Sequence, residues 1–476
     1  MQHVKVDVAV IGAGTAGLAA YRAAVAAGKR AVIIEGGPFG TTCARVGCMP
    51  SKLLIAAAEA AHGVARWPAF GLRLDGPMRV DGRAVMARVR RERDRFVGFV
   101  LDGVDKIPAR DRLIGYARFT GPHALEVTWP DGGVAFAVEF GRAVIATGSS
   151  PDLPPVLRAA GDRLIVNDDV FDWQDLPSSV AVFGPGVIGP ELGQALHRLG
   201  VRVHLFGRGG RVGPFQDAAL QDYARRTMAA EFPLHADATD VQVRRDGDAV
   251  EVTFSANGQT QALRVDYVLA ATGRTPNVRG LGLEHTGIAL DARGIPLFDR
   301  RTLQCGESHI FIAGDANADL PLLHEAADEG RIAGENAARW PAVVPGSRRT
   351  PIAVVFSDPQ MAVVGAPFAS LDPSRIVTGD VSFEDQGRSR VMLRNKGLLH
   401  VYVDVESGLL LGAEMIGPDA EHIAHLLAWV IQLGQTVDAV LALPFYHPVV
   451  EEGLRTALRN AKARRDMALL AQAMAA

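Results

Sequence analysis

Two stretches of the chain share one change of hydrophobic pattern. An apolar run at 4–11 passes through G-A-G-T-A-G into apolar residues at helical spacing, and the run that starts at Ser179 does the same through G-P-G-V-I-G. Each is followed by a second apolar run, at 31–34 and at 201–206. The order strand, glycine turn, helix and strand is typical of a dinucleotide-binding unit. The pattern therefore predicts two dinucleotide sites.

A second repeat marks the points where the chain leaves these units. The letters A-T-G and a following proline close the apolar runs at 143–151 and 268–276, and a glycine-aspartate element follows at 310–316. We interpret this order as a first nucleotide-binding domain that is interrupted by a second and then completed. The predicted boundaries are 1–150 and 276–344 for the first domain, 151–275 for the second, and 345–476 for a C-terminal domain.

The pattern changes after about residue 345. Apolar residues alternate on both sides of Glu406-Ser407-Gly408, which predicts an antiparallel hairpin, and helical spacing returns at 421–433 and 450–463. The expected fold class is therefore α/β, with two Rossmann-like dinucleotide-binding domains and a C-terminal α+β domain.

Composition excludes several classes of protein. The chain has 476 residues, a formal net charge of −3 and 48% hydrophobic residues, as expected for two or three globular domains that bind neither nucleic acid nor a membrane. The arginine-rich stretch 88–95 is interleaved with apolar residues at helical spacing, which indicates a solvated helix face. Three cysteines are too few for a disulfide framework, and the N-terminus has no secretory pattern, so we expect a cytoplasmic location.

The first glycine turn has the residue types that a dinucleotide needs. Gly12 allows the tight turn, Gly14 lets the backbone approach a pyrophosphate, and Gly17 lets the helix pack on the strand. Glu35 ends the second strand, where a carboxylate can accept hydrogen bonds from both ribose hydroxyls. Another α/β fold could match the glycines alone, but the flanking strand, helix and acid favour a nucleotide site.

The second turn has Gly184, Gly186 and Gly189 in the same roles, but no acid ends its second strand. Arg208 and Arg211 follow instead. A carboxylate there would repel a 2′-phosphate, whereas arginines bind one, so this loop favours NADP(H) over NAD(H). The alternative is that both arginines are ordinary solvent-exposed loop charges.

Cys43 and Cys48 are separated by four residues and precede a helical run that opens at Pro50 and Ser51. Cys48 is therefore expected at a helix N-terminus, where partial positive charge stabilises the thiolate that attacks disulfides or reduces a flavin. Lys52, one turn into the helix, adds positive charge. The alternatives are two buried thiols or half of a zinc site. The sequence offers no matching Cys/His pair to complete four zinc ligands, so no metal is expected.

The segment G-T-T-C-A-R-V-G-C-M-P-S-K closely resembles the redox motif of the group I pyridine nucleotide-disulfide oxidoreductase family, and the similarity extends over essentially the whole chain. Dihydrolipoamide dehydrogenase, glutathione reductase and mercuric reductase belong to this family. The resemblance implies FAD in the first nucleotide domain and NAD(P) in the second. It implies that Cys48 lies against the flavin, that Cys43 exchanges with substrate, and that Lys52 pairs with Glu191. The further residues expected at the cofactors are Thr42, Thr147, Gly148, Gly273, Asp315 and His324.

The C-terminal sequence F-Y-H-P-V-V-E-E resembles the His-Pro motif of the same family. This resemblance implies that His447 is an acid and base for the exchanging thiols and that Glu452 orients its ring. Without the family, a histidine before proline is more often a turn or core residue. Family members place this histidine over the flavin of the partner subunit, so a homodimer is implied.

Several positions depart from the family pattern. Arg45 replaces a common asparagine, Pro190 an aliphatic residue and Val449 the usual threonine, and none of these changes removes a reactive group. Cys305 matches no redox motif and is interpreted as structural. No cysteine follows Arg464, which argues against a mercuric reductase or a large thioredoxin reductase.

The sequence leaves the reaction open. The P-S-K ending favours dihydrolipoyl dehydrogenase activity on a small or protein-bound dithiol such as a lipoyl group. The Arg208 loop favours an NADPH-dependent reductase of a low-molecular-weight disulfide, similar to glutathione reductase. An alternative of another class is a flavin-binding assembly subunit. The intact set of Cys43, Cys48, Lys52 and His447 speaks against this alternative, because a scaffold needs none of them.

Overall fold

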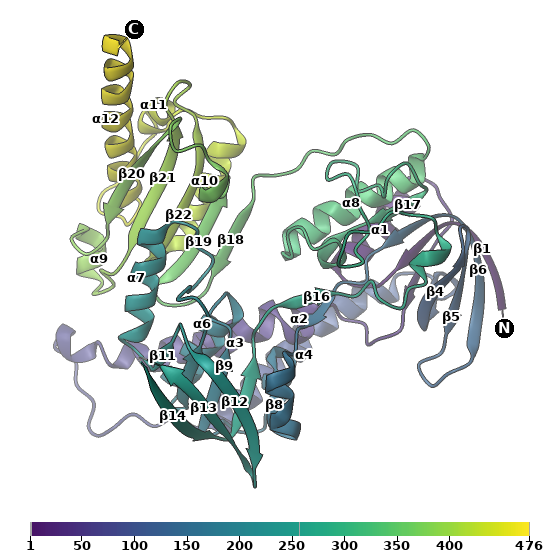
Figure 1. Ribbon diagram of the computed structural model, residues 1–476, viewed down its shortest axis with the longest axis horizontal. Helices are drawn as coiled ribbons and strands as arrows, with labels where there is room; N and C mark the ends of the chain where they lie inside the picture. The colour runs from purple at the N-terminus through teal and green to yellow at the C-terminus, as the bar shows by residue number, and fades with distance from the viewer. Residues whose placement is uncertain (1, 257, 476) are drawn as a thin grey trace. The chain divides into compact units, whose positions relative to one another are not determined.

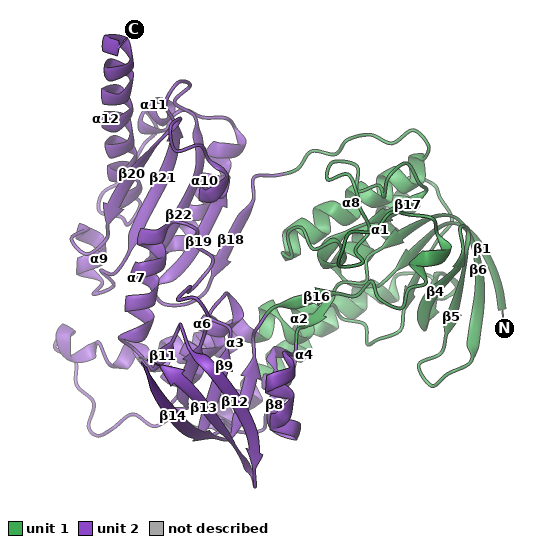
Figure 2. Ribbon diagram, viewed as in Figure 1, with its two compact units in different colours: residues 1–50, 89–152, 273–348 green, residues 51–88, 153–272, 349–476 purple. Residues whose placement is uncertain are grey.

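The computed structural model describes residues 2–256 and 258–475, which form two compact units (Figure 2). Unit 1 thus includes most of the predicted first nucleotide domain, and unit 2 includes most of the predicted second nucleotide domain and of the C-terminal domain, together with residues 51–88 of the predicted first domain. The finer division into three domains stays a prediction. The segments of unit 1 are 1–50, 89–152 and 273–348, and those of unit 2 are 51–88, 153–272 and 349–476.

Unit 1 is built on a sheet in the order β3-β2-β1-β6-β5-β4, with β17 paired to β6. Strands β1, β2, β3, β6 and β17 run parallel, whereas β4, β5 and β6 form an antiparallel meander. The first two predicted strands are therefore parallel neighbours. The strands are β1 (Gln2–Ile11), β2 (Ala31–Glu35), β3 (Arg112–Ile114), β4 (Tyr116–Gly121), β5 (Ala124–Thr128), β6 (Val134–Ile145) and β17 (Ile310–Ile312).

Helices α1 (Thr15–Ala26) and α8 (Leu323–Arg339) pack together on this sheet (Figure 1). A Cβ atom added at Gly330 would lie 2.1 Å from the carbonyl oxygen of Ala16. Because glycine has no Cβ, the backbones of the two helices approach closely here. The apolar face of α1 is thereby buried, and its N-terminus stays beside the glycine turn.

The two short segments that follow the A-T-G sequences lie side by side. β7 (Ser149–Pro151) pairs antiparallel with β16 (Arg274–Pro276). The side-chain amide nitrogen Nδ2 of Asn277 donates to the carbonyl oxygen of Thr147 over 3.1 Å. The second sequence repeat therefore marks two neighbouring points in unit 1.

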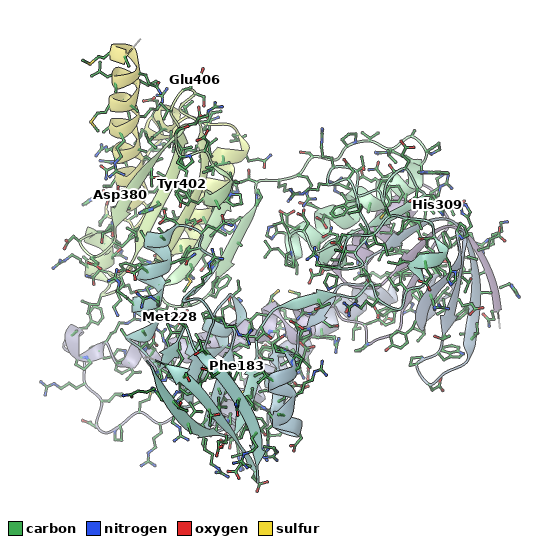
Figure 3. The ribbon with its side chains drawn as sticks, viewed as in Figure 1. Phe183, Met228, His309, Asp380, Tyr402 and Glu406 are labelled. Atoms are coloured by element: carbon green, nitrogen blue, oxygen red, sulfur yellow. The ribbon has the colours of Figure 1, made fainter. Side chains whose placement is uncertain are left out.

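Unit 2 contains a second parallel sheet in the order β11-β10-β9-β15-β8. β9 leads through the second glycine turn into α6 (Ile188–Arg198), as the sequence predicts. Phe183 of β9 and Met228 of α7 (Ala218–Ala229) are buried in this part (Figure 3). The other strands are β8 (Leu164–Val166), β9 (Ser179–Phe183), β10 (Arg202–Phe206), β11 (Leu234–His235) and β15 (Tyr267–Ala270), and a three-stranded antiparallel sheet contains β12 (Thr239–Asp246), β13 (Ala249–Ala256) and β14 (Gln259–Val265).

The C-terminal part of unit 2 is an antiparallel sheet in the order β18-β19-β22-β21-β20. The predicted hairpin is confirmed as β21 and β22. Alternate residues of β21 face opposite ways: Val401 packs in a core with α10 and α12, whereas His400 contacts Asp217 before α7. Helix α12 extends beyond its predicted end at 463. The elements are β18 (Ile352–Val355), β19 (Gln360–Gly365), β20 (Ile376–Ser382), β21 (Leu398–Asp404), β22 (Leu410–Gly417), α10 (Ala420–Gln432) and α12 (Glu452–Ala475).

The cysteine segment and the arginine-rich segment are both helical. Arg88, Arg91 and Arg95 are exposed, which agrees with a solvated helix face. Among the described residues, no helix is both long enough and apolar enough to cross a membrane. The helices are α2 (Thr42–Val46), α3 (Cys48–Val64), α4 (Gly82–Asp105), α5 (Asn167–Val170), α9 (Gly387–Val391) and α11 (Val437–Leu441), with short 3-10 turns at Trp67–Phe70, Ala109–Asp111, Pro155–Arg163, Leu283–His285, Gly314–Asn317 and Phe368–Ser370.

Candidate active site and nucleotide sites

The first glycine turn connects β1 to α1 in unit 1. A Cβ atom at Gly12 would lie 2.3 Å from the carbonyl oxygen of Ala146, and one at Gly17 would lie 1.8 Å from that of Gly12. A Cβ atom at Gly14 would meet no atom within 4 Å. Two glycines therefore serve close packing, while the third leaves space in front of the N-terminus of α1. Unpaired amides at a helix N-terminus bind phosphate well.

Glu35 ends β2 beside this turn. Its Oε2 accepts a hydrogen bond from the backbone nitrogen of Ala13 at 2.8 Å, and its Oε1 accepts one from Gly37 at 2.8 Å. The two amides fix the carboxylate at the strand end. Each carboxylate oxygen has a further lone pair, so Glu35 fits the ribose contact expected from the sequence.

Asp315 lies in the 3-10 turn after β17. Its Oδ2 accepts a 2.6 Å hydrogen bond from the hydroxyl of Ser149. The buried Oγ1 of Thr147 and the buried Nε2 of His324 have no hydrogen-bond partner within residues 2–256 and 258–475. Buried polar atoms rarely lack a partner, so both atoms fit a site that a bound ligand completes. The residues of unit 1 therefore fit FAD.

The other residues expected at the cofactors lie at element ends. Gly148 follows β6 with a φ of 68°, and Gly273 precedes β16 with a φ of 123°. Both values lie in the region that favours glycine. Thr42 is the first residue of α2 and is exposed.

The second glycine turn repeats the geometry of the first. A Cβ atom at Gly184 would lie 2.1 Å from the carbonyl oxygen of Ala271, and one at Gly189 would lie 1.9 Å from that of Gly184. A Cβ atom at Gly186 would again meet no atom within 4 Å. Unit 2 therefore has the same cradle for a pyrophosphate at the N-terminus of α6.

The loop after β10 carries Arg208 and Arg211, and both side chains are exposed. The nearby carboxylate of Asp237 accepts a 3.0 Å hydrogen bond from the backbone nitrogen of Gly209. This acid therefore fixes the loop backbone. Neither arginine has an ion pair in the described part of the chain. Both guanidinium groups are available to an anionic ligand.

Cys43 and Cys48 lie on two consecutive helices, the short α2 and the longer α3. Cys43 is in α2 and half-buried, and Cys48 is the exposed first residue of α3, as predicted. Gly47 separates the helices, and a Cβ atom there would lie 3.2 Å from the Cα of Cys43. The small residue thus lets α3 begin close to α2. The position of Cys48 at a helix N-terminus favours its thiolate.

Lys52 and Glu191 form the expected ion pair in unit 2. The Nζ atom of Lys52 lies 2.8 and 2.9 Å from the two carboxylate oxygens and 4.4 Å from the ring centre of Phe356. Glu191 also accepts a 2.8 Å hydrogen bond from the backbone nitrogen of Phe356, and only 5% of the residue is exposed. The buried carboxylate therefore fixes the position of the ammonium group.

His447 and Glu452 are also in contact. The Nδ1 atom of the histidine lies 3.0 and 3.1 Å from the carboxylate oxygens, and the backbone nitrogen of Val449 donates to the same carboxylate over 3.3 Å. The hydrogen bond from His447 lowers the pKa of Glu452. Because both contacts are at Nδ1, the exposed Nε2 side can exchange a proton with a ligand.

Sequence reasoning missed a buried charged cluster behind Glu191. The guanidinium of Arg198, 5% exposed, contacts the carboxylates of Glu231 at 2.6 Å and Asp358 at 3.0 Å. Gln194 donates to Glu231 over 2.7 Å. The helix pattern of α6 gave no signal for this cluster, because its partners lie far away in the sequence.

Cys305 is buried in the core, and burial raises its pKa to about 12, which agrees with a structural role.

Several named proteins are similar to this chain over nearly its whole length. Dihydrolipoyl dehydrogenase of Geobacillus stearothermophilus is 31% identical over 94% of this chain and 94% of the relative. Mercuric reductase of Shigella flexneri is 32% identical over 95% of this chain and 80% of the relative. The crystal structure of LpdA from Mycobacterium tuberculosis has a TM-score of 0.81 and 26% identity, and covers 96% of this chain and 99% of that structure.

Two family models match the chain in succession. The pyridine nucleotide-disulphide oxidoreductase model matches residues 6–330, and the dimerisation domain of the same family matches residues 352–458. The first match contains both glycine turns and both cysteines of the redox motif. The second contains His447 and Glu452. The chain is therefore a member of the pyridine nucleotide-disulphide oxidoreductase family, a group of flavoproteins that use FAD and NAD(P)H.

Proposed function

We propose that the protein is a dihydrolipoyl dehydrogenase that oxidises a lipoyl dithiol. The observation that carries the proposal is the redox motif at the start of α3, where Cys48 occupies the helix N-terminus and Lys52 follows one turn later. Relatives named dihydrolipoyl dehydrogenase support the choice of substrate, with 30% and 31% identity over almost the whole chain. A dithiol that closes to a small cyclic disulfide suits a site with two neighbouring cysteines.

The proposed reaction begins with Cys43 and Cys48 joined as a disulfide. The Nε2 atom of His447 accepts a proton from the first substrate thiol, and the resulting thiolate attacks the Sγ atom of Cys43. The bond between the cysteines breaks, and Cys48 leaves as a thiolate. The second substrate thiol attacks the substrate sulfur of the mixed disulfide, the bond to Cys43 breaks, and the Cys43 thiolate takes up the proton that this thiol releases. The substrate departs as a disulfide, and its two electrons remain on the cysteine pair.

Each remaining charged group has a defined task in this proposal. Glu452 keeps the His447 ring in place and stabilises its protonated form. Lys52, positioned by Glu191, provides positive charge near Cys48. Bound FAD would supply an acceptor for the two electrons and a hydride donor to the nicotinamide. The residues of this chain bind the cofactors, orient the sulfur atoms and move the protons.

We also propose a homodimer in the cytoplasm, in which His447 of one subunit serves the cysteine pair of the other. The match to the family's dimerisation domain supports two subunits. His447 is exposed over 80% of its side chain, which suits a residue that meets a second subunit and a substrate.

A second candidate is an NADPH-dependent reductase of a low-molecular-weight disulfide. The exposed Arg208 and Arg211, without ion pairs in the described residues, favour it. Initial rates with dihydrolipoamide, oxidised glutathione and Hg(II), each with NAD(H) and NADP(H), separate the candidates. The main proposal expects the highest kcat/KM with dihydrolipoamide. Turnover only with oxidised glutathione or only with Hg(II) would refute it.

Arg208→Glu should weaken NADPH binding and spare NADH. The substitution places a carboxylate where a 2′-phosphate would lie, so we expect KM for NADPH to rise by about tenfold or more. Arg202→Glu, an exposed position on β10, makes the same charge change and serves as the control. An unchanged ratio of the two KM values in Arg208→Glu would show that this loop does not contact the phosphate.

Cys48→Ser should remove the long-wavelength absorption that arises between a thiolate and FAD in the two-electron-reduced protein. The reason is that serine has no thiolate to donate electron density to the flavin. Anaerobic reduction with dithionite and a visible spectrum are sufficient for the test. A band that persists in Cys48→Ser and disappears in Cys43→Ser would reverse the order of the two thiols.

A further inference from the structure

The turn that carries Asp315 rests on a single buried carboxylate. The backbone nitrogen of Gly314 and the side-chain amide of Asn317 both donate to Oε2 of Glu329, over 2.8 and 2.7 Å. Glu329 is fully buried, with 0% of the residue exposed. Asp315 itself accepts its 2.6 Å hydrogen bond from Ser149 on the other side of the turn. The turn is therefore held at both ends and at its centre.

Arg348 supplies the positive charge for this carboxylate. Its Nη2 atom lies 2.9 Å from Oε1 of Glu329 and 2.8 Å from Oε2 of Glu325, which is also buried. The contact with Glu329 is an ion pair rather than a directed hydrogen bond, because Oε1 has no hydrogen-bond partner. Nη1 of Arg348 donates to the carbonyl oxygen of Arg300 over 3.1 Å, so the guanidinium position is fixed.

The charge state of the buried Glu329 depends on the positive charge of Arg348. Burial raises the pKa of Glu329, while the Gly314 amide and the Arg348 charge act in the opposite direction. A buried carboxylate that loses its cation tends to take up a proton. A protonated Glu329 accepts hydrogen bonds more weakly, and the turn that presents Asp315 would then be less well held.

From these contacts we propose that Glu329 and Arg348 are positioning residues for FAD. Neither residue is among those that the sequence predicts at the cofactor. Instead they hold the Gly314–Asn317 turn so that Asp315 is pre-organised to bind the ribityl and phosphate region. This inference rests on the proposed role of Asp315 and adds to it two residues, one of them in the loop after α8. Pre-organisation of a binding group increases affinity because less freedom is lost on binding.

The first test compares three side chains at position 329 in the purified holoenzyme. FAD dissociation constants are measured by ultrafiltration over a dilution series. Glu329→Gln keeps an oxygen acceptor for both donors but loses the negative charge, so its constant should rise by about threefold, less than in a variant without any acceptor. Glu329→Leu removes the acceptor, so its constant should rise by about tenfold or more. Equal FAD binding in Glu329→Leu and wild type would overturn the proposal.

The second test measures how the FAD dissociation constant depends on pH. A purely structural role of the two residues would not produce this dependence. In Arg348→Met, FAD binding should weaken as the pH falls, because burial raises the pKa of Glu329 and loss of the Arg348 charge raises it further, so that the carboxylate takes up a proton more readily. Arg348→Lys should restore most of the affinity. Arg331→Met removes an exposed arginine of α8 and is the matched control. The other charged or titratable groups near Glu329 are Asp319, Arg300, His324 and Glu325.

The double variant Arg348→Met with Glu329→Gln identifies the titrating group. Glutamine does not change charge, so FAD affinity in the double variant should no longer depend on pH. A pH dependence that persists would assign the effect to Glu325 or Asp319 and refute the role of Glu329. A protein that binds FAD normally but does not oxidise dihydrolipoamide would refute the proposed function alone. The two failures are therefore distinguishable.

Discussion

Replacement of Cys43 by serine should abolish turnover of every dithiol and disulfide substrate, by at least about 10⁴-fold in kcat. A serine hydroxyl forms neither the internal disulfide nor the mixed disulfide with substrate. FAD should remain bound at wild-type stoichiometry, because Gly12, Glu35 and Asp315 belong to other elements of unit 1. Steady-state rates and the visible spectrum of the purified variant measure both quantities.

Cys305→Ser is the matched control for this prediction. The same chemical change is made at a thiol that is 2% exposed and lies in the core, so activity should be retained. Activity of Cys43→Ser above about a tenth of wild type would exclude Cys43 as the exchanging thiol. If the protein were an assembly subunit instead, cells that carry Cys43→Ser would grow and assemble complexes normally even though disulfide reduction is lost.

The second large effect is expected for His447→Gln. Glutamine keeps the size and polarity of the side chain but cannot transfer a proton, so the rate of dithiol oxidation should fall by about 10²–10⁴-fold. Reduction of FAD by NAD(P)H should be unaffected, because that half-reaction uses neither His447 nor Glu452. Stopped-flow measurement of the two half-reactions separates the effects. His422→Gln, an exposed histidine 4.0 Å from Glu421, is the control.

Mixed dimers test whether His447 acts across subunits. Cys43→Ser and His447→Gln homodimers are each expected to be inactive. If their subunits are exchanged at random, half of the dimers are hybrids with one complete site, and activity should recover to about a quarter of wild type. No recovery, although hybrids are detected by mass spectrometry, would show that the histidine serves the cysteines of its own subunit.

The elements around the nucleotide sites could be predicted because their causes are local. Gly17 is required by its contact with Gly12 in the same turn, Gly12 has the positive φ of 105° that this turn needs, and the apolar runs identify the strands. The position of Cys48 at a helix N-terminus could also be predicted, because Pro50 and the good helix formers after it indicate where the helix begins. The contact between His447 and Glu452 also spans only five residues.

The parts that could not be predicted depend on residues distant in the sequence. Glu329 and Arg348 look like ordinary charges of a helix and a loop, and only the packing of α8 on the sheet buries Glu329 and leaves the Arg348 side chain 18% exposed beside it. Arg198 is similar, because its partner Asp358 lies 160 residues away. The end of α12 was placed too early for another reason. Its last residues, from Met467 on, are alanine, leucine, methionine and one glutamine, which continue a helix without a stop signal.

The discontinuous make-up of unit 1 has a consequence for protein synthesis. Strand β17 pairs with β6 inside the sheet, but it is made only after the intervening segment 153–272 has left the ribosome. A nascent chain can therefore assemble the sheet around β9 before the sheet around β1 is complete. Translation that stops before residue 310 leaves residues 143–145 of β6 without their β17 partner and exposes apolar strand surface to chaperones and proteases. FAD capture must accordingly be a late event in the life of each new chain.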